Sequence, residues 1–435
     1  MKTSLTKRIL AIFGAILICA SMATPALAEN KYNAVNGSSI GFKKALVMDA
    51  EANVPDVEFE YSIEEGVGIP YAAGSKFQVL KPSDAGVTGT PTIGKATFAP
   101  GNAANTIVTS TQTQPVNSQP DGQGQNSNHT IVTLAAGEKA AMKDINVDFS
   151  GVSFPEPGVY RYLIKETSAG QQGISYDIQH ASDDNANGFT LKQRVLDVYV
   201  VDNSGTLSVM NYVFHEKVDD IIAGTDYGTS GNPSPVDDKS LGFVNRYTTY
   251  DIAFEKEVAG NQASKDKYFK FEVAITNAGK NARLDLNFAD ADGALNPTAN
   301  NATVYDVATM KAANTVDDDS TNEGQQIVCD ASGAVTKTFY LQHGQKLRIN
   351  GLAQGANVVI TETPEDYKCD QASNKITLSN LAADSLANKF TNTRNGTVPT
   401  GVLLSVIPGA VVGAGAVAGL VAMIAKKNKK EEDED

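Results

Sequence analysis

The sequence predicts an all-β protein that consists of two β-sandwich domains in tandem. The composition is one reason: threonine, valine, asparagine and glycine are abundant, tryptophan is absent, and heptad patterns are few. A second reason is the alternation of apolar and polar residues, which is typical of strands with one buried face. In addition, the same series of signals occurs twice, which assigns the domains to residues 29–246 and 247–395.

The first 28 residues predict a secretory signal peptide. They contain a basic start, an apolar run and a small-x-small cleavage site, formed by Lys2, Lys7, Arg8, residues 9–20 and Ala26-Leu27-Ala28. The apolar run is too short to span a bilayer comfortably, so an uncleaved anchor is disfavoured. We therefore expect the chain to be exported.

The first domain is expected to open with a strand whose buried face includes a lysine. The alternating residues are Ile40, Phe42, Lys44, Leu46 and Met48, and a second such strand carries Val57, Phe59, Tyr61 and Ile63. A lysine among apolar side chains is costly to bury unless a partner satisfies it. Lys43 is also nearby, but it is out of phase with Phe42.

Residues 86–128 interrupt this pattern. They are rich in threonine, asparagine, glutamine and glycine and have no clear periodicity. The stretch predicts a long polar insertion in the first domain. The alternatives are a flexible polar loop, a small extra subdomain and a loop that binds a ligand.

Two further polar residues are in phase with apolar neighbours later in the first domain. Glu166 alternates with Tyr162 and Ile164, and Asn245 shares a face with Phe243 in the closing strand. The order along the domain is therefore lysine, glutamate, asparagine.

The second domain repeats this order. Lys256 alternates with Phe254 in the opening strand, Glu362 alternates with Ile360, and Asn392 lies in the closing strand. As in the first domain, a threonine directly follows the glutamate.

These repeated triads resemble those of the streptococcal-type pilin isopeptide-linkage family, whose domains have an immunoglobulin-like (CnaB-type) β-sandwich fold. In that family a lysine of the first strand bonds covalently to an asparagine of the last strand, assisted by a glutamate. The resemblance covers nearly the whole chain between the terminal segments and is weakest over residues 86–128. It implies two cross-links, Lys44–Asn245 assisted by Glu166 and Lys256–Asn392 assisted by Glu362.

Elementary chemistry explains why a lysine, a glutamate and an asparagine suffice to form such a bond. A dry core disfavours the charged forms of an amine and a carboxyl group. The neutral amine is then a nucleophile, the carboxamide carbon is its electrophile, and the carboxyl group can move protons as ammonia leaves. No cofactor, metal or external enzyme is needed. The alternative is a buried ion pair with a hydrogen-bonded asparagine, but two triads in the same order favour cross-linking.

Residues 396–435 predict a sorting signal. Residues 402–425 are apolar and long enough to form a transmembrane helix, and a lysine cluster follows on the expected cytoplasmic side. The preceding Val398-Pro399-Thr400-Gly401 resembles the signal of sortase substrates. It implies that a sortase cysteine attacks the Thr400 carbonyl and releases Gly401 onward, so membrane anchoring is transient.

Together, the resemblances imply the major subunit of a sortase-assembled covalent pilus on a Gram-positive cell wall. The implied partners are sortase, other copies of the chain, and peptidoglycan or accessory pilins, with host surface ligands as a further option. Polymerisation needs a lysine that receives Thr400. In the family this acceptor lysine lies near the end of the first domain. Lys239 occupies that place here, and Lys217 is the second choice. The alternative is that Lys239 is simply an exposed, solvated charge.

Two other functions are alternatives to a major pilus subunit. The first is an accessory pilin or a single wall-anchored adhesin that binds host ligands. On gels of wall extracts, a single anchored band would indicate the adhesin, whereas polymer ladders would indicate the major subunit. A wall-anchored enzyme is disfavoured, because the four histidines have no metal-ligand spacing and no phosphate loop or nucleophile motif is present.

The net charge narrows the range of partners. Without residues 1–28 and 401–435 the chain carries 29 basic and 45 acidic residues, a net charge of −16, which disfavours nucleic acid and anionic lipid. Cys329 and Cys369 remain after export. Their spacing leaves open whether they form a disulfide or stay separate thiols.

Overall fold

The computed structural model describes residues 38–68, 78–110, 116–120, 126–177, 193–215, 240–289 and 325–396. The signal peptide, Lys217, Lys239 and the sorting signal with Thr400 and Gly401 lie outside these ranges. Within the described ranges no helix is long and apolar enough to cross a membrane; residues 402–425 are not among them.

The first domain contains two main sheets. One has the order β11-β14-β1-β9-β4, with β6 also paired to β9, and the other has the order β13-β12-β10-β3. The strands of the first sheet are β11 (Ile174–Ser175), β14 (Gly242–Tyr247), β1 (Ser39–Asp49), β9 (Glu138–Asp148), β4 (Thr92–Ile93) and β6 (Thr106–Thr109). Those of the second are β13 (Thr206–His215), β12 (Gln193–Asn203), β10 (Gly158–Glu166) and β3 (Tyr61–Glu65).

The second domain repeats this two-sheet arrangement. Its sheets have the orders β18-β17-β20-β15-β24-β22 and β19-β16-β21-β23. The six-stranded sheet contains β18 (Gln325–Val328), β17 (Arg283–Ala289), β20 (Lys346–Ala353), β15 (Thr249–Ala259), β24 (Ser385–Thr393) and β22 (Lys368–Cys369). The four-stranded sheet contains β19 (Val335–Leu341), β16 (Phe269–Thr276), β21 (Asn357–Thr363) and β23 (Lys375–Leu378), and the short 3-10 helix η4 (Ala372–Asn374) precedes β23. The prediction of two tandem all-β sandwiches is therefore confirmed.

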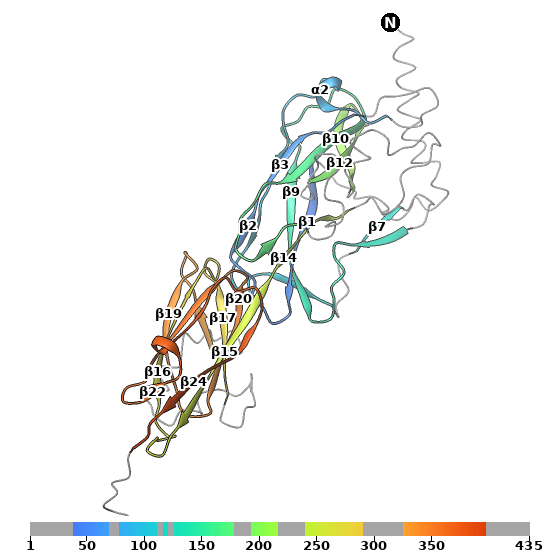
Figure 1. Cartoon of the computed structure of the whole chain (residues 1–435). Coiled ribbons are helices and arrows are strands. Elements are labelled where there is room, and N and C mark those ends of the chain that lie inside the picture. The colour runs from blue at the N-terminus through green and yellow to red at the C-terminus, as the bar shows by residue number, and fades with distance from the viewer. Residues whose placement is uncertain are drawn as a thin grey trace, which may run out of the picture.

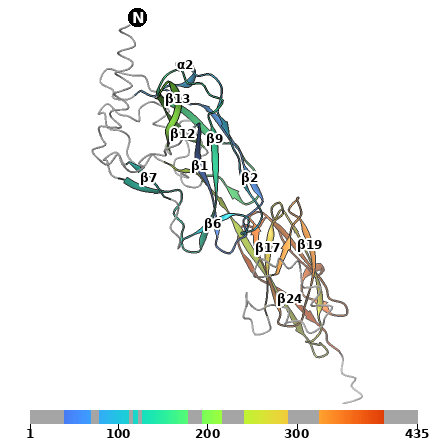
Figure 2. The same ribbon diagram turned by 180° about the vertical axis from the view of Figure 1, so that it is seen from behind.

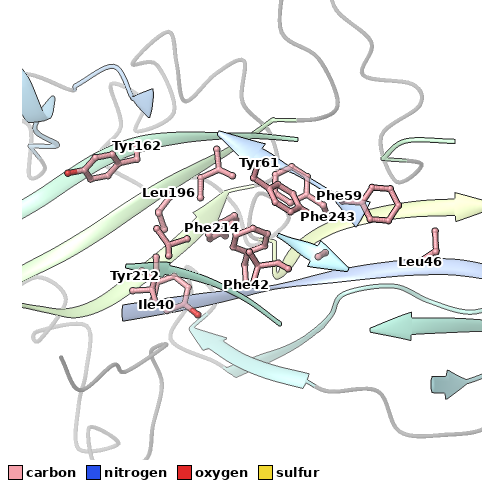
Figure 3. Packing of buried hydrophobic residues seen from close by; sticks show 14 of the residues in the cluster. Ile40, Phe42, Leu46, Phe59, Tyr61, Tyr162, Leu196, Tyr212, Phe214 and Phe243 are labelled. Carbon is pink, nitrogen blue, oxygen red and sulfur yellow. The ribbon is translucent and has the colours of Figure 1, made fainter. Parts of the chain in front are cut away.

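Aromatic side chains fill the space between the two sheets of the first domain. Phe42 from β1 lies 5.2 Å from the ring of Tyr61 on β3 and 5.6 Å from that of Phe243 on β14, measured between centroids. Figure 3 shows these rings gathered around Phe214. The alternation of apolar residues predicted this core, because residues two apart on a strand share a face.

The first and last strands of each domain are direct neighbours and run parallel. In the first domain Lys44 is opposite Phe243 and Leu46 is opposite Asn245. In the second, Lys256 is opposite Phe390 and Val258 is opposite Asn392. The asparagine is thus two positions beyond the lysine in both domains, which puts both side chains on the same face of the sheet.

A glycine permits this close pairing in the first domain. Gly242 begins β14 with a φ of 151°, and a Cβ atom there would lie 1.8 Å from the carbonyl oxygen of Lys43. Any larger residue would push the last strand away from the first.

The structure differs from the sequence prediction in two places. The predicted strand from Val57 to Ile63 is divided into β2 (Val57–Phe59) and β3, because β2 pairs with β5 (Ala96–Phe98) while β3 pairs with β10. The polar stretch 86–128 is not one loop. It follows the short helix α2 (Pro82–Ala85) and contributes β4 to β6, β7 (Val116–Pro120) and the start of β8 (Asn126–Thr130).

The two domains lie end to end (Figures 1 and 2). Only Thr248 separates β14 from β15, and its N–H donates to Gly173 O at 2.9 Å. Across the junction, Asn53 Nδ2 donates to Asp285 Oδ2 at 2.9 Å. The end of the first domain therefore continues directly into the opening strand of the second.

Candidate cross-linking sites

The first predicted triad meets inside the first sandwich. Lys44 Nζ donates to Glu166 Oε2 at 2.8 Å, and Asn245 Nδ2 donates to Glu166 Oε1 at 2.7 Å. Lys44 and Asn245 belong to the six-stranded sheet, whereas Glu166 reaches them from β10 in the facing sheet. One carboxylate thus holds the amine and the carboxamide together.

This site is closed to solvent. Lys44 and Asn245 are fully buried and Glu166 is 4% exposed. The Lys44 ammonium lies 4.6 Å from the centroid of the Phe59 ring. Burial lowers the pKa of Lys44 to about 8, although Glu166 opposes this shift. By contrast, the neighbouring Lys43 is partly exposed and pairs with Asp144 at 2.6 Å, as its phase predicted.

Two residues that the sequence analysis missed complete the first site. The backbone N–H of Asp177 donates to Asn245 Oδ1 at 2.7 Å. Arg194 Nη1 lies 2.8 Å from Asp177 Oδ2, and Arg194 Nη2 donates to Asp177 Oδ1 at 3.0 Å. Both residues are buried. Asp177 precedes residues 178–192, where no alternation of apolar residues predicts a strand, so no sequence pattern indicates its role. Arg194, by contrast, is in phase with Leu196 and Val198 on β12, and this alternation is a signal that could have placed it in the core.

The second triad has the same core arrangement. Lys256 Nζ lies 2.7 Å from Glu362 Oε1, and Asn392 Nδ2 donates to the same oxygen at 2.8 Å. Glu362 again comes from the facing sheet, on β21. Lys256 and Asn392 are fully buried, and burial lowers the pKa of Lys256. Lys256 also lies 4.5 Å from the centroid of the Phe269 ring.

The surroundings of the two asparagines differ. Among the described residues, Asn392 Oδ1 has no hydrogen-bond partner. The residue opposite Asn392 in the ladder is Cys369. Burial raises the pKa of the Cys369 thiol to about 11, and the neighbouring Glu362 adds to this increase. The thiol is therefore protonated at neutral pH.

The disulfide alternative for Cys329 and Cys369 is wrong in this structure, where both cysteines are free. Cys329 directly follows β18 and Cys369 ends β22, and these strands are the two opposite edges of the six-stranded sheet. Five steps of about 4.8 Å separate such edges, whereas bonded cysteines need Cα atoms within about 7 Å. The distance follows from the strand order, which the spacing of the cysteines does not reveal.

A second buried charge cluster lies away from the triads, in the four-stranded sheet of the first domain. Arg161 Nε and Nη2 donate to the two carboxylate oxygens of Asp197 at 2.7 and 2.8 Å. His215 Nε2 lies 3.1 Å from Asp197 Oδ2. Burial alone would raise the pKa of Asp197, but Arg161 outweighs it and holds the pKa below its usual range.

No group of three or more metal-ligating side chains capable of holding an ion occurs in the described part of the chain. The chemical groups that meet at each of the two triads are an amine, a carboxyl group and a carboxamide. Because the amine and the carboxamide share one carboxylate, the arrangement can exchange the side-chain nitrogen of the asparagine for that of the lysine.

Comparison with known proteins shows which families and proteins this chain is similar to. Residues 97–248 match the model of the Spy0128-like isopeptide containing domain, and residues 250–394 match a domain of unknown function (DUF7601). A pilin of Streptococcus pyogenes serotype M1 is 24% identical over 329 residues, which cover 71% of this chain and 79% of that protein. The chain is a relative of the streptococcal pilins.

The resemblance to Gram-positive pilins that the sequence predicted is thus confirmed. Solved structures of two major pilins from S. pyogenes are also similar to this pilin relative. Each is 16% identical and aligns with 83% of the chain; the matches cover 100% and 99% of those proteins, with TM-scores of 0.43 and 0.44.

Proposed function

We propose that this chain is the major structural subunit of a sortase-assembled covalent pilus on a Gram-positive cell surface, stabilised by two internal isopeptide bonds. The observation that carries the proposal is the pair of buried triads, each of which connects the first strand of a domain to its last strand. Kinship with streptococcal pilins supports the surface location. The chain is then a structural protein whose only chemistry is on itself.

Each bond would form by the same exchange of nitrogen atoms. The neutral Nζ of Lys44 attacks Cγ of Asn245, Glu166 passes a proton from this nitrogen to Nδ2, and ammonia leaves. One C–N bond forms and one breaks, so no oxidant or cofactor is required. The contacts of 2.8 and 2.7 Å from Glu166 to the two nitrogens support this role.

The intact mass of residues 29–396, denatured and reduced, tests the proposal. Two bonds remove two molecules of ammonia, so the expected deficit is about 34 Da relative to the sequence. Glu166→Ala and Glu362→Ala should each restore about 17 Da, because each removes the proton carrier of one triad. Glu58→Ala serves as the control, since Glu58 is an exposed glutamate paired with Lys95; its deficit should stay at about 34 Da. A mass equal to the sequence value would mean that the triads are only polar contacts.

The rate of bond formation should depend on pH. The pKa of Lys44 is lowered to about 8, so the reactive neutral amine is a minority below that pH and the majority above it. The rate of the Lys44–Asn245 mass loss should therefore rise about tenfold per pH unit from pH 6 and level off above pH 8. Peptide mapping of freshly synthesised chain at each pH measures this rate. A flat profile between pH 6 and 8 would show that amine deprotonation does not limit the reaction.

Polymerisation would use residues that lie outside the described ranges. In this proposal sortase cleaves after Thr400 and transfers its carbonyl to Lys239 of another copy, with Lys217 as the alternative acceptor. Replacing Lys239 with arginine keeps the charge but removes the acceptor amine, so the ladder of polymers on gels of wall extracts should be lost. Lys217→Arg is the matched control, and normal ladders in Lys239→Arg together with their loss in Lys217→Arg would reverse the assignment.

A further inference from the structure

The surroundings of Asn245 show a feature that the triad chemistry alone does not require. Its carboxamide is held at both ends: Nδ2 donates to Glu166, and Oδ1 accepts the backbone N–H of Asp177 at 2.7 Å. Asp177 has a φ of 42°, in the left-handed region that residues other than glycine rarely adopt. Such backbone conformations persist only where the surroundings enforce them, and they cluster at functional sites.

Arg194 enforces this conformation. It contacts both carboxylate oxygens of Asp177 at 2.8 and 3.0 Å. The guanidinium is itself anchored, because Nε donates to Gly242 O at 3.1 Å and Nη1 donates to Gln193 O at 2.8 Å. It also lies 4.8 Å from the centroid of the Phe243 ring. The N–H of Asp177 is therefore aimed at Asn245 by a fixed and fully buried support.

We propose that the backbone N–H of Asp177 is the oxyanion donor for the first cross-link and that Arg194 is its positioning residue. When Lys44 Nζ attacks Cγ, the electron pair of the C=O bond moves onto Oδ1. The N–H of Asp177 already points at this oxygen and stabilises the charge. The C=O bond re-forms as ammonia departs. Donors fixed in advance in a dry site stabilise such charge strongly.

The second domain provides an internal comparison. It has the same lysine, glutamate and asparagine, but within the described ranges no donor reaches Asn392 Oδ1. The donor is therefore not a necessary by-product of the shared fold. It is specific to the first domain, whose link closes the longer loop.

The test removes this N–H alone and rests on the proposed cross-linking. In residues 29–396, Asp177 is replaced by its α-hydroxy acid through suppressor translation, which turns the N–H into an ester oxygen and keeps the side chain. Phe149 is the control position, because it is buried in the same domain and its N–H also makes a backbone hydrogen bond of 2.7 Å, to Ser38 O. Chain made in a short cell-free pulse is quenched with acid at intervals, and both linked peptides are quantified by mass spectrometry.

The ester at position 177 should slow closure of the Lys44–Asn245 link by roughly 100- to 1,000-fold. It should leave the Lys256–Asn392 link unchanged, and the ester at 149 should leave both links unchanged. Asp177→Gly keeps the N–H and readily adopts a positive φ, but it removes the carboxylate that Arg194 holds. It should therefore slow closure of the first link by about tenfold, much less than the ester does.

Closure of the first link in the 177 ester as fast as in the 149 ester would overturn the inference while leaving the cross-link itself established. A glycine variant as fast as the unsubstituted chain would overturn the positioning role of Arg194, because the N–H would then reach Asn245 without the carboxylate that Arg194 holds. Absence of both links in the unsubstituted chain would refute the proposed function, and this inference with it.

Discussion

Pulled from its two ends, the chain is expected to extend without the unfolding of either domain. With Asn245→Ala, the first domain should instead unfold under force and release the roughly 200 residues between Lys44 and position 245, a length of about 70 nm at about 3.5 Å per residue. Asn392→Ala should release about 47 nm from the second domain by the same conversion. Single-molecule force spectroscopy measures these steps.

The strand order is the physical reason for this expectation. Tension enters at β1, and Lys44 would pass it through a covalent bond to Asn245 on the adjacent parallel strand β14. Only Thr248 separates β14 from β15, where Lys256 would pass the tension to Asn392 in the same way. The rest of each sandwich lies outside this path and carries no load.

Lys43→Ala is the matched control for the force experiment. Lys43 is adjacent to Lys44 on β1 but pairs with Asp144 at the surface. This variant should extend without unfolding, like the unsubstituted chain. A 70 nm step in the unsubstituted chain would mean that the first domain bears force through its hydrogen bonds alone.

The sequence predicted the triads well because they lie on strands with strict alternation. On β1, β10 and β14 the lysine, the glutamate and the asparagine each share a face with buried aromatic or aliphatic residues. A face of a strand is fixed by a period of two, so the sequence alone could assign Lys44 to the core and Lys43 to the surface.

What the sequence could not predict depends on contacts between distant segments. The break between β2 and β3 arises because β2 has a different partner strand, β5, from the polar stretch. The role of Asp177 depends on a backbone N–H and a left-handed φ, to which no side-chain pattern corresponds. Likewise, Cys329 and Cys369 lie on opposite sheet edges because of the strand order, which their spacing does not encode.

Loss of a cross-link should also lower thermal stability strongly. Asn392→Ala would release a loop of about 135 residues, and by analogy with disulfides this costs about 5 kcal/mol of folding free energy. The melting temperature of the second domain should fall by roughly 10–20 °C, as measured by calorimetry. The variant keeps the Lys256–Glu362 contact of 2.7 Å, so no buried charge loses its partner and the effect reports mainly on the lost link.

Asn388→Ala separates the covalent effect from the loss of polar contacts. Asn388 lies on the same strand, β24, and its Nδ2 donates to Ala253 O and Ser385 O, each at 2.9 Å. Asn388 therefore donates more hydrogen bonds than Asn392, for which the structure shows one, to Glu362. Hydrogen bonds contribute about 1 kcal/mol each, so the loss of these two should lower the melting temperature by roughly 4–8 °C. Asn388 belongs to neither triad, whereas Asn392 shares its triad with Lys256. If Asn388→Ala lowered the melting temperature as much as Asn392→Ala does, the loss of stability in Asn392→Ala could not be assigned to a covalent bond.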